Sequence, residues 1–420
     1  MIVLDTDHLS ELQQPQSGRG VRLSGRLQQQ GDRPIATTIV SVEEQLRGRL
    51  AQISKNPAGT QQVVPYAELL DHLEFYSEWL ILPFDQPAAQ QFHNLKAARI
   101  SEEAGLEFIL PVARWHGYRG ETDSEGTSLE TLTWAAGLLA ETRELVVFGT
   151  VHVPLINPIF AAKQCITADQ IGQGRFGLNI VSGWNAGEFE MFGVQLLEHD
   201  ERYVYSEEWA AIVKRVWTEH EPFDFAGKYF NLKGVMIKPK PYGSGRPLLL
   251  SAGSSPAGRA FAARHADCLF MVVVDPETLP QEIASLRQQA AGRSIGVYAS
   301  GHVICRRTAK ETDEYYHYIV DEMGDWAAAD HMADIRRGGQ SVPAERLQQM
   351  KARLISGTGT LPMIGDPDAV AAKFKFLSDA GLDGMAFGLV NYVDDFPFFR
   401  AEVMPRLERL GLRGGVQAAT

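Results

Sequence analysis

Apolar runs alternate with amphipathic segments over most of the chain. After residue 100, seven apolar runs have the length and character of buried strands, at 107–112, 145–151, 176–181, 248–251, 269–274, 296–304 and 384–389. Segments with helical periodicity lie between and after them, at 129–141, 159–171, 203–218, 256–265, 279–291, from 310 onward, 366–380 and 396–410. Strands that alternate with helices indicate a parallel α/β sheet. The unbroken series favours a (β/α)₈ barrel of the TIM type over an open doubly wound sheet.

The strand count falls one short of such a barrel. The segment 96–105 resembles the end of a first helix, but no barrel strand precedes it. We therefore predict a barrel that lacks its own first strand and presents two unpaired strand edges. One alternative is that the early apolar run 2–4 fills the gap.

The first hundred residues follow a different pattern. A short strand at 2–4 is followed by a polar, Gln-rich stretch to about residue 33, an apolar run at 35–40 and a helix beyond it. Helical periodicity returns at 66–79 and 87–99, with a short strand at 80–82 between them. We predict a partial α/β domain at 1–100, the barrel at 101–413 and a disordered tail at 414–420.

Composition narrows the functional class. The chain has 420 residues and a net charge of −12, which argues against a nucleic-acid-coating surface and against an anionic membrane partner. No signal peptide and no apolar stretch long enough for a bilayer is visible, so a cytoplasmic location is expected. Cys165, Cys268 and Cys305 are far apart and form no metal-binding or disulfide pattern.

Several motifs of the larger piece carry a family resemblance. They lie at 105–123, 128–142, 174–193, 199–209, 222–234 and 251–267, in the order in which the family has them. Together they resemble the bacterial luciferase-like flavin monooxygenases, and among these the pyrimidine, alkanesulfonate and dialkylsulfone monooxygenases. The resemblance extends to about residue 412. The resemblance implies an enzyme that acts on a small organic substrate with O₂ and reduced FMN. A separate flavin reductase would supply the reduced FMN. Some relatives associate into homo-oligomers.

The resemblance also implies the cofactor-binding residues. Carried over position by position, the FMN contacts fall on Ala113, Arg114, Asn179, Glu188, Arg202, Tyr203 and Ser255. The residues themselves agree with this, because several of them follow strands, and loops after barrel strands build the site. In the stretch 252–256, a glycine, a capping serine and a proline at the first helical position form a helix N-terminus that favours an anion such as the FMN phosphate.

The sequence names no general acid or base. His152, at the end of a strand, is the first candidate for a polar group facing the flavin, and His302 is the second. A histidine in a strand is more often a hydrogen-bonded structural residue, since its ring also satisfies backbone groups. The catalytic residue therefore stays unassigned.

The first hundred residues resemble the PIN-domain ribonucleases of toxin–antitoxin pairs, through the motifs at 3–12 and 38–48. A PIN site gathers carboxylates around divalent ions, and here Asp5 and Glu44 match two of them. The family's further acidic segments would follow residue 100, where this chain passes into the flavin-enzyme motif. Two carboxylates leave Mg²⁺ short of its roughly six ligands. We predict that no metal is bound at this remnant and that nuclease activity is absent.

Three functional hypotheses remain open at this point. The first is an FMN-dependent monooxygenase whose activity is impaired by the missing strand. The second is a metal-dependent PIN ribonuclease toxin. The third is a non-catalytic fusion product that binds flavin weakly or not at all.

Overall fold

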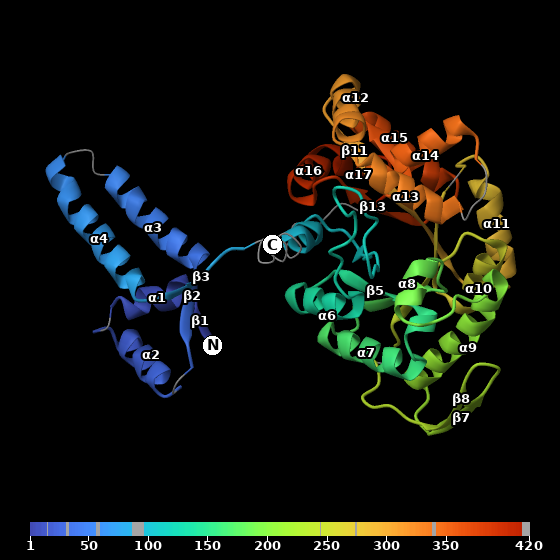
Figure 1. Ribbon diagram of the computed structural model, residues 1–420, viewed down its shortest axis with the longest axis horizontal. Helices are drawn as coiled ribbons and strands as arrows, with labels where there is room; N and C mark the ends of the chain where they lie inside the picture. The colour runs from blue at the N-terminus through green and yellow to red at the C-terminus, as the bar shows by residue number, and fades with distance from the viewer. Residues whose placement is uncertain are drawn as a thin grey trace. The chain divides into compact units, whose positions relative to one another are not determined.

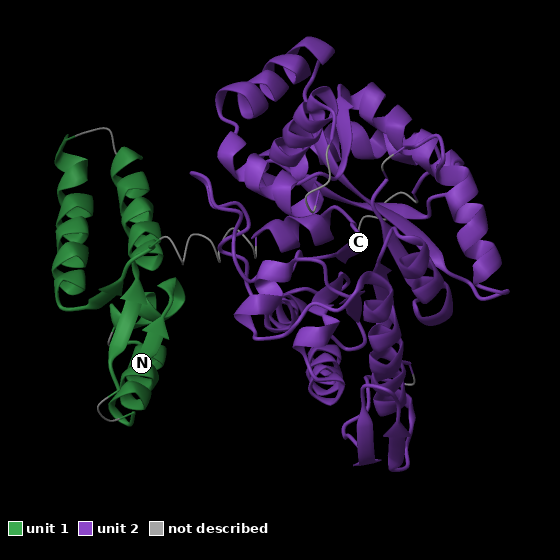
Figure 2. Cartoon of the chain, turned by 45° about the vertical axis from the view of Figure 1, so that its right-hand side comes forward, with its two compact units in different colours: residues 1–94 green, residues 95–420 purple. Residues whose placement is uncertain are grey.

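The computed structural model describes residues 1–14, 16–30, 33–55, 59–85, 96–243, 245–273, 275–337 and 342–413. The chain divides into two compact units, Met1–Asn94 and Leu95–Thr420 (Figure 2). This division lies before the boundary expected at 100/101, because residues 96–103 are helical and Ala98 packs into the core of the second unit. The tail expected to be disordered, 414–420, lies outside the described residues.

The first unit is built on a three-stranded parallel sheet in the order β1 (Ile2–Leu4), β2 (Ile35–Thr38), β3 (Leu80–Leu82). Its long helices are α3 (Ile39–Ser54) and α4 (Val63–Ser77), joined by the turn η1 (Gly59–Gln62). The core consists of Leu4, Leu9, Val42 and Tyr76. The run 2–4 is thus a strand of this sheet, paired with Ile35–Thr37.

The polar, Gln-rich stretch before β2, to which the sequence analysis assigned no element, is helical. It contains α1 (Thr6–Leu12) and α2 (Gly18–Gln28), each begun by a side-chain cap, from Asp5 and Ser17. Such caps satisfy backbone N–H groups that a helix start leaves free. Leu9 is fully buried and anchors α1 against the core. One buried apolar side chain and two caps are therefore enough to form helices in a stretch of polar composition.

The second unit surrounds a curled parallel sheet with helices (Figure 1). Its strands are β4 (Phe108–Ile109), β5 (Val146–His152), β6 (Phe176–Val181), β9 (Leu248–Ala252), β10 (Cys268–Met271), β11 (Gly296–Cys305), β12 (Leu361–Gly365) and β13 (Gly384–Leu389). Its helices are α6 (Thr131–Glu141), α7 (Pro158–Ile171), α8 (Ala186–Met191), α9 (His199–Thr218), α10 (Pro256–His265), α11 (Leu279–Gln289), α12 (Ala309–His317), α13 (Trp326–Arg337), α14 (Ala344–Gly357), α15 (Pro367–Asp379), α16 (Tyr392–Phe398) and α17 (Met404–Arg409). A short 3₁₀ helix, η2 (Val153–Leu155), and two short π-helices, η3 (Tyr318–Glu322) and η4 (Phe399–Val403), also belong to the unit. A separate antiparallel hairpin is formed by β7 (Phe223–Ala226) and β8 (Asn231–Val235).

All seven expected strands are present, and the α/β class with a curled parallel sheet is confirmed. The strands pair in the order β4-β5-β6-β9-β10-β11, and both β13 and the unpredicted β12 pair with β11. Within the described residues β4 pairs only with β5 and β13 only with β11, so the sheet does not close between them.

Successive side chains along each strand alternate between the apolar clusters beneath the helices and the inside of the curled sheet. On β5, β6, β11 and β13, every second residue packs against one of two large apolar clusters beneath the helices, for example Val147, Leu178 and Val303. Because successive side chains of a strand point to opposite faces, the intervening residues face the inside of the curl. That inner set includes Thr150, His152 and Asn179, which places the site expected from the sequence inside the sheet. None of the described helices combines the length and the apolar character needed to cross a bilayer.

Candidate active site

A cavity of about 600 Å³ opens at the ends of the strands inside the curl. Ala113, Arg114 and Asn179, three of the predicted FMN contacts, line it, and so do both candidate histidines, His152 and His302. Its size is typical of small-molecule and cofactor sites. Residues from distant parts of the sequence therefore meet in one cavity, because parallel strands bring their carboxyl ends to the same side of the sheet.

Arg114 is held by two carboxylates, one of them fully buried. Its Nε donates to Glu125 Oε2 at 2.9 Å, and its Nη1 lies 3.7 Å from Oε2 of Glu188, a side chain with no exposed surface. The Trp115 backbone N–H donates to the other oxygen of Glu188 at 3.1 Å. The Trp184 ring covers the guanidinium, with its centroid 4.9 Å from Cζ. Glu188 does not line the cavity; it fixes Arg114, which does.

Asn179 presents an unused acceptor. Its Nδ2 donates to Thr150 Oγ1 at 3.1 Å, and Thr150 Oγ1 donates in turn to the Pro111 carbonyl at 2.8 Å. This chain fixes the amide orientation and leaves Asn179 Oδ1 buried with no partner within the described protein. Buried polar atoms are normally hydrogen-bonded, so an unpartnered oxygen that lines a cavity indicates a ligand donor.

The two histidines differ in what their rings contact. His302 Nδ1 lies 2.9 Å from Thr360 Oγ1 and its Nε2 lies 3.1 Å from Ser356 Oγ, so both nitrogens are used. His152 Nδ1, in contrast, is buried without a partner. Burial, and then the nearby Arg114, lowers the pKa of His152 to about 4, and burial followed by Arg353 lowers the pKa of His302 to about 4. Both rings are therefore neutral at pH 7.

These pKa values predict loss of stability in mild acid. The unfolded chain takes up a proton on each histidine near pH 6.5, whereas the folded chain resists protonation until about pH 4. The free energy of unfolding is then highest above pH 6.5 and falls by about 1.4 kcal/mol per pH unit for each of His152 and His302 as the pH drops from 6 toward 4. Urea unfolding at pH 7, 6 and 5, repeated on His302→Gln, measures this. The variant should show the smaller slope, and an equal slope in the two proteins would contradict the prediction.

Ser255 and Tyr203 meet at the N-terminus of α10. Ser255 caps this helix, accepting from the Gly258 N–H at 3.1 Å, and its Oγ donates to the Tyr203 hydroxyl at 3.4 Å. Gly253 and Gly258 approach each other here, since a Cβ on Gly258 would lie 2.7 Å from the Tyr203 oxygen and 3.0 Å from Gly253 Cα. Backbone N–H groups at a helix start attract anions.

The seven predicted FMN contacts thus form two neighbouring groups and not one lining. Ser255 and Tyr203 lie outside the residues that line the cavity, although Ala252, at the end of β9, lines it. Arg202 is also outside; its Nη1 donates to the Gly183 carbonyl, next to Trp184, and its Nε is buried without a partner. Arg202 therefore connects the two groups through the backbone at 183–184.

The sequence missed three side chains that position the site. Thr150 orients Asn179, Glu125 pairs with Arg114, and Trp184 covers Arg114. Thr150 had a readable signal, because it stands two residues before His152 on the same face of β5. Glu125 and Trp184 lie in segments outside the strands, and only the fold brings them to Arg114.

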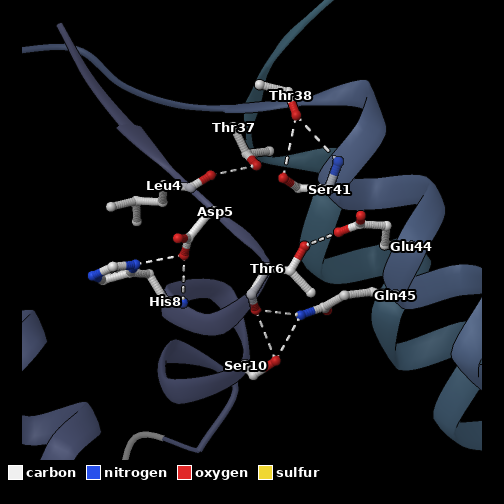
Figure 3. A network of polar contacts seen from close by, with 10 residues as sticks. All are labelled: Leu4, Asp5, Thr6, His8, Ser10, Thr37, Thr38, Ser41, Glu44 and Gln45. Atoms are coloured by element: carbon white, nitrogen blue, oxygen red, sulfur yellow. Dashed lines mark hydrogen bonds and ion pairs between the residues drawn. The ribbon is translucent and has the colours of Figure 1, made fainter. Parts of the chain in front are cut away.

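In the first unit, Asp5 and Glu44 have local roles (Figure 3). Asp5 accepts from the His8 backbone N–H at 3.0 Å and lies 2.5 Å from His8 Nδ1, and these bonds hold its pKa below the usual value. Glu44 accepts from Thr6 Oγ1. Among the described residues no group of three or more His, Cys, Asp or Glu side chains is placed to hold a metal ion. Asp5 acts here as a helix cap.

Fold and site together define a class: an α/β protein of the barrel type with a cofactor-sized cavity inside its curled parallel sheet. The luciferase-like monooxygenase family matches residues 81–384. The chain belongs to this family, which confirms the prediction of an oxidoreductase of the monooxygenase class. The match does not extend over the first 80 residues, whose resemblance to PIN ribonucleases stays a prediction.

Individual relatives agree with this assignment. The chain is 31% identical to the FMNH₂-dependent dimethylsulfone monooxygenase of Pseudomonas fluorescens, over 76% of this chain and 87% of that one. It is 29% identical to the pyrimidine monooxygenase of Agrobacterium fabrum, over 73% and 86%. Dependence of the first of these relatives on FMNH₂ agrees with the cofactor predicted from the sequence.

Solved structures share the fold. A riboflavin lyase bound to modified FMN and riboflavin superposes with a TM-score of 0.69 at 22% identity, over 78% of this chain and 87% of that one. An EDTA monooxygenase from Chelativorans sp. BNC1 superposes with a TM-score of 0.67 at 20% identity, over 78% and 88%.

Proposed function

We propose that the chain is an FMN-dependent monooxygenase that takes reduced FMN from a separate flavin reductase and uses O₂ on a small organic substrate of the pyrimidine, sulfonate or sulfone type. The observation that carries this proposal is the pair of buried, unpartnered atoms at one cavity, Asn179 Oδ1 and His152 Nδ1. A polar ring edge that offers hydrogen bonds satisfies such atoms, and the cavity volume suits a cofactor-sized ligand. The residues present therefore fit FMN.

The two groups of side chains suit the two ends of FMN. Asn179, Arg114 and the backbone at Ala113 are proposed to hold the polar edge of the flavin ring. Ser255, Tyr203 and the start of α10 are proposed to hold the phosphate, with Arg202 supporting the backbone between the groups. Bound reduced FMN supplies the electrons and the site of oxygen activation, as cofactors carry the chemistry in such enzymes.

The chain's own contribution is position and electrostatics. Two carboxylates neutralise the charge of Arg114. This side chain therefore has a fixed position but adds no net positive field to the cavity. His152 is neutral at pH 7 and serves as a hydrogen-bonding group at Nδ1. The apolar cavity walls keep water away, which strengthens each of these contacts. The alternative ribonuclease function has no comparable support, since Asp5 and Glu44 are engaged locally.

Substrate-dependent oxygen uptake tests the proposal. The full chain is mixed with FMN, a flavin reductase, NADH and dimethylsulfone or uracil, and formation of the oxygenated product is measured. We expect product only when chain, reductase and substrate are all present, and a loss of about 10-fold or more in Asn179→Leu, which removes a hydrogen-bonding pair. Product at the same rate in Asn179→Leu would contradict the assigned site.

A further inference from the structure

The loop 114–128, between β4 and α6, is bonded to a distant part of the chain. Arg114 and Glu125, near its two ends, both line the cavity. Its middle meets the residue before α13, where Asp325 Oδ2 accepts hydrogen bonds from the Thr122 N–H at 2.8 Å and from the Thr122 hydroxyl at 2.9 Å. The two residues are 203 positions apart in the sequence. A side chain at the start of α13 therefore holds a loop that supplies two residues to the cavity.

The backbone of this loop is strained. Arg119, Asp123 and Glu125 have φ angles of 59°, 43° and 64°. Residues other than glycine rarely adopt this left-handed conformation, and it persists only where the surroundings fix it. Within the loop, Asp123 accepts from the Arg119 N–H at 3.1 Å with its side chain and from the Gly126 N–H at 2.7 Å with its carbonyl. These bonds fix the internal shape of the loop, so its position depends on contacts with other elements.

The helices α13 and α14 supply those contacts. Tyr118, in the loop, is fully buried in an apolar cluster that is separate from the two large ones. Trp184, whose ring covers Arg114, packs against the same cluster. The other buried members of this cluster come from the two helices: Ala329, Met332, Ala333 and Leu354. The loop and the ring over Arg114 thus share one support.

Asp325 is the polar part of this support. Its Oδ1 accepts from the Ala328 N–H at 2.9 Å and so caps α13, while its Oδ2 holds Thr122. Gly120 approaches it so closely that a Cβ there would lie 2.4 Å from both carboxylate oxygens. The bond from the Thr122 backbone, and then the bond from the Ala328 backbone, hold the pKa of Asp325 below its usual value. The carboxylate is therefore charged at pH 7, and hydrogen bonds to a charged acceptor are strong.

We propose that Asp325 is a positioning residue for the flavin site: it fixes the loop, the loop places Glu125, and Glu125 holds Arg114. This inference rests on the proposed function and deepens it, because Arg114 is proposed to hold the polar edge of the flavin ring. The last step is the bond from Arg114 Nε to Glu125 Oε2 at 2.9 Å. Asp325 is not among the residues that line the cavity, so it acts through Glu125 and not on the ligand.

The substitution Asp325→Ser separates the positioning role from the helix cap. A serine caps a helix as well as an aspartate does, as Ser255 caps α10, but it has no second oxygen for Thr122. Asp366→Ser is the matched control. Asp366 caps α15 through a bond from the Ala369 N–H at 2.9 Å, and it lies outside the cavity lining. Urea unfolding establishes that each variant is folded.

Hydrogen exchange of the full chain without FMN tests the first step. The Thr122 amide loses its acceptor in Asp325→Ser, so we expect it to exchange at least 10-fold faster, with faster exchange across 117–126. Asp366→Ser should leave the exchange of these residues unchanged. Equal protection of the loop in Asp325→Ser and in the unmodified chain would overturn the proposal.

The FMN affinity of the full chain, measured by titration calorimetry, tests the steps through Glu125. We expect Asp325→Ser to bind FMN about 10-fold more weakly and Asp366→Ser to bind it as the unmodified chain does. Glu125→Ala should weaken FMN by at least as much. In the double variant Asp325→Ser/Glu125→Ala the loss should stay within about 2-fold of that in Glu125→Ala alone, because the loop then has no carboxylate to place. A purely structural role of Asp325 would instead multiply the two losses, and that result would refute the proposal.

Thr122→Val approaches the same contact from the loop and carries the test if Asp325→Ser does not fold. It removes one of the two bonds to Asp325 and leaves the cap of α13 in place. We expect about 3-fold weaker FMN binding, and no further loss when Glu125→Ala is also present. FMN affinity equal to that of the unmodified chain would overturn the proposal.

The FMN titration of the unmodified chain keeps the two claims apart. Failure of that chain to bind FMN contradicts the proposed function itself. FMN binding by the unmodified chain, together with equal affinity in a folded Asp325→Ser variant whose loop exchanges faster, contradicts the positioning role alone.

Discussion

Replacing Arg114 by methionine is expected to lower the free energy of unfolding of the second unit by about 3–5 kcal/mol. The reason is Glu188, whose side chain is fully buried and faces Arg114 across 3.7 Å. Without the guanidinium, this carboxylate stays in the interior with only the Trp115 N–H as a partner. Breaking one side of a buried ion pair is costly because it leaves an uncompensated charge.

A double-mutant cycle separates this effect from lost packing. Glu188→Gln keeps the shape and removes the charge, so the double variant Arg114→Met/Glu188→Gln should recover most of the stability that Arg114→Met loses. Urea unfolding followed by tryptophan fluorescence measures all four proteins. Equal losses in the single Arg114→Met variant and the double variant would mean that the buried pair is not the cause.

The second large effect is expected at Gly258. An alanine there places a Cβ 2.7 Å from the Tyr203 hydroxyl, at the end of a stiff ring, and 3.0 Å from Gly253 Cα. The start of α10 must then open, and the phosphate loses charge-assisted hydrogen bonds worth about 1.5–3 kcal/mol. FMN affinity should fall about 10- to 100-fold in Gly258→Ala.

Two comparisons make this prediction specific. Tyr203→Phe removes the clashing oxygen, so adding Gly258→Ala to Tyr203→Phe should cost much less than in the unmodified chain. Gly137→Ala on α6, where nothing lies within 4 Å of an added Cβ, is the matched control and should leave FMN affinity unchanged. The role given to this turn would be contradicted if the losses of FMN affinity in Tyr203→Phe and Gly258→Ala simply added in the double variant. A similar loss of affinity in Gly137→Ala would also contradict it.

Periodicity predicted the regular core of the second unit well. β6, β13 and α10 have the bounds expected from the sequence, because a buried strand and a capped amphipathic helix each leave a local signal. β12, five residues that include Pro362, was missed because it lies in the stretch after residue 310 that the pattern predicted as helical. α1 and α2 were missed because both helices are mostly polar. Their formation depends on two capping side chains and one buried leucine, which give little periodic signal.

The site was predictable only in part, for a physical reason. The family resemblance assigned Ala113 and Asn179 to the flavin site. Strand ends are readable from the sequence, so these residues and His152 were also expected on one side of the sheet, and all three line one cavity. Contacts between side chains of different loops cannot be predicted from periodicity. Only the fold brings Glu125 and Trp184 into contact with Arg114.

The account depends most on one flavin site inside the curled sheet, and calorimetric titration of the full chain with FMN tests it directly. We expect saturation at one FMN per chain, with weaker binding in Asn179→Leu and in Gly258→Ala. No heat of binding at millimolar FMN in a folded chain, or binding that both substitutions leave unchanged, would contradict the site.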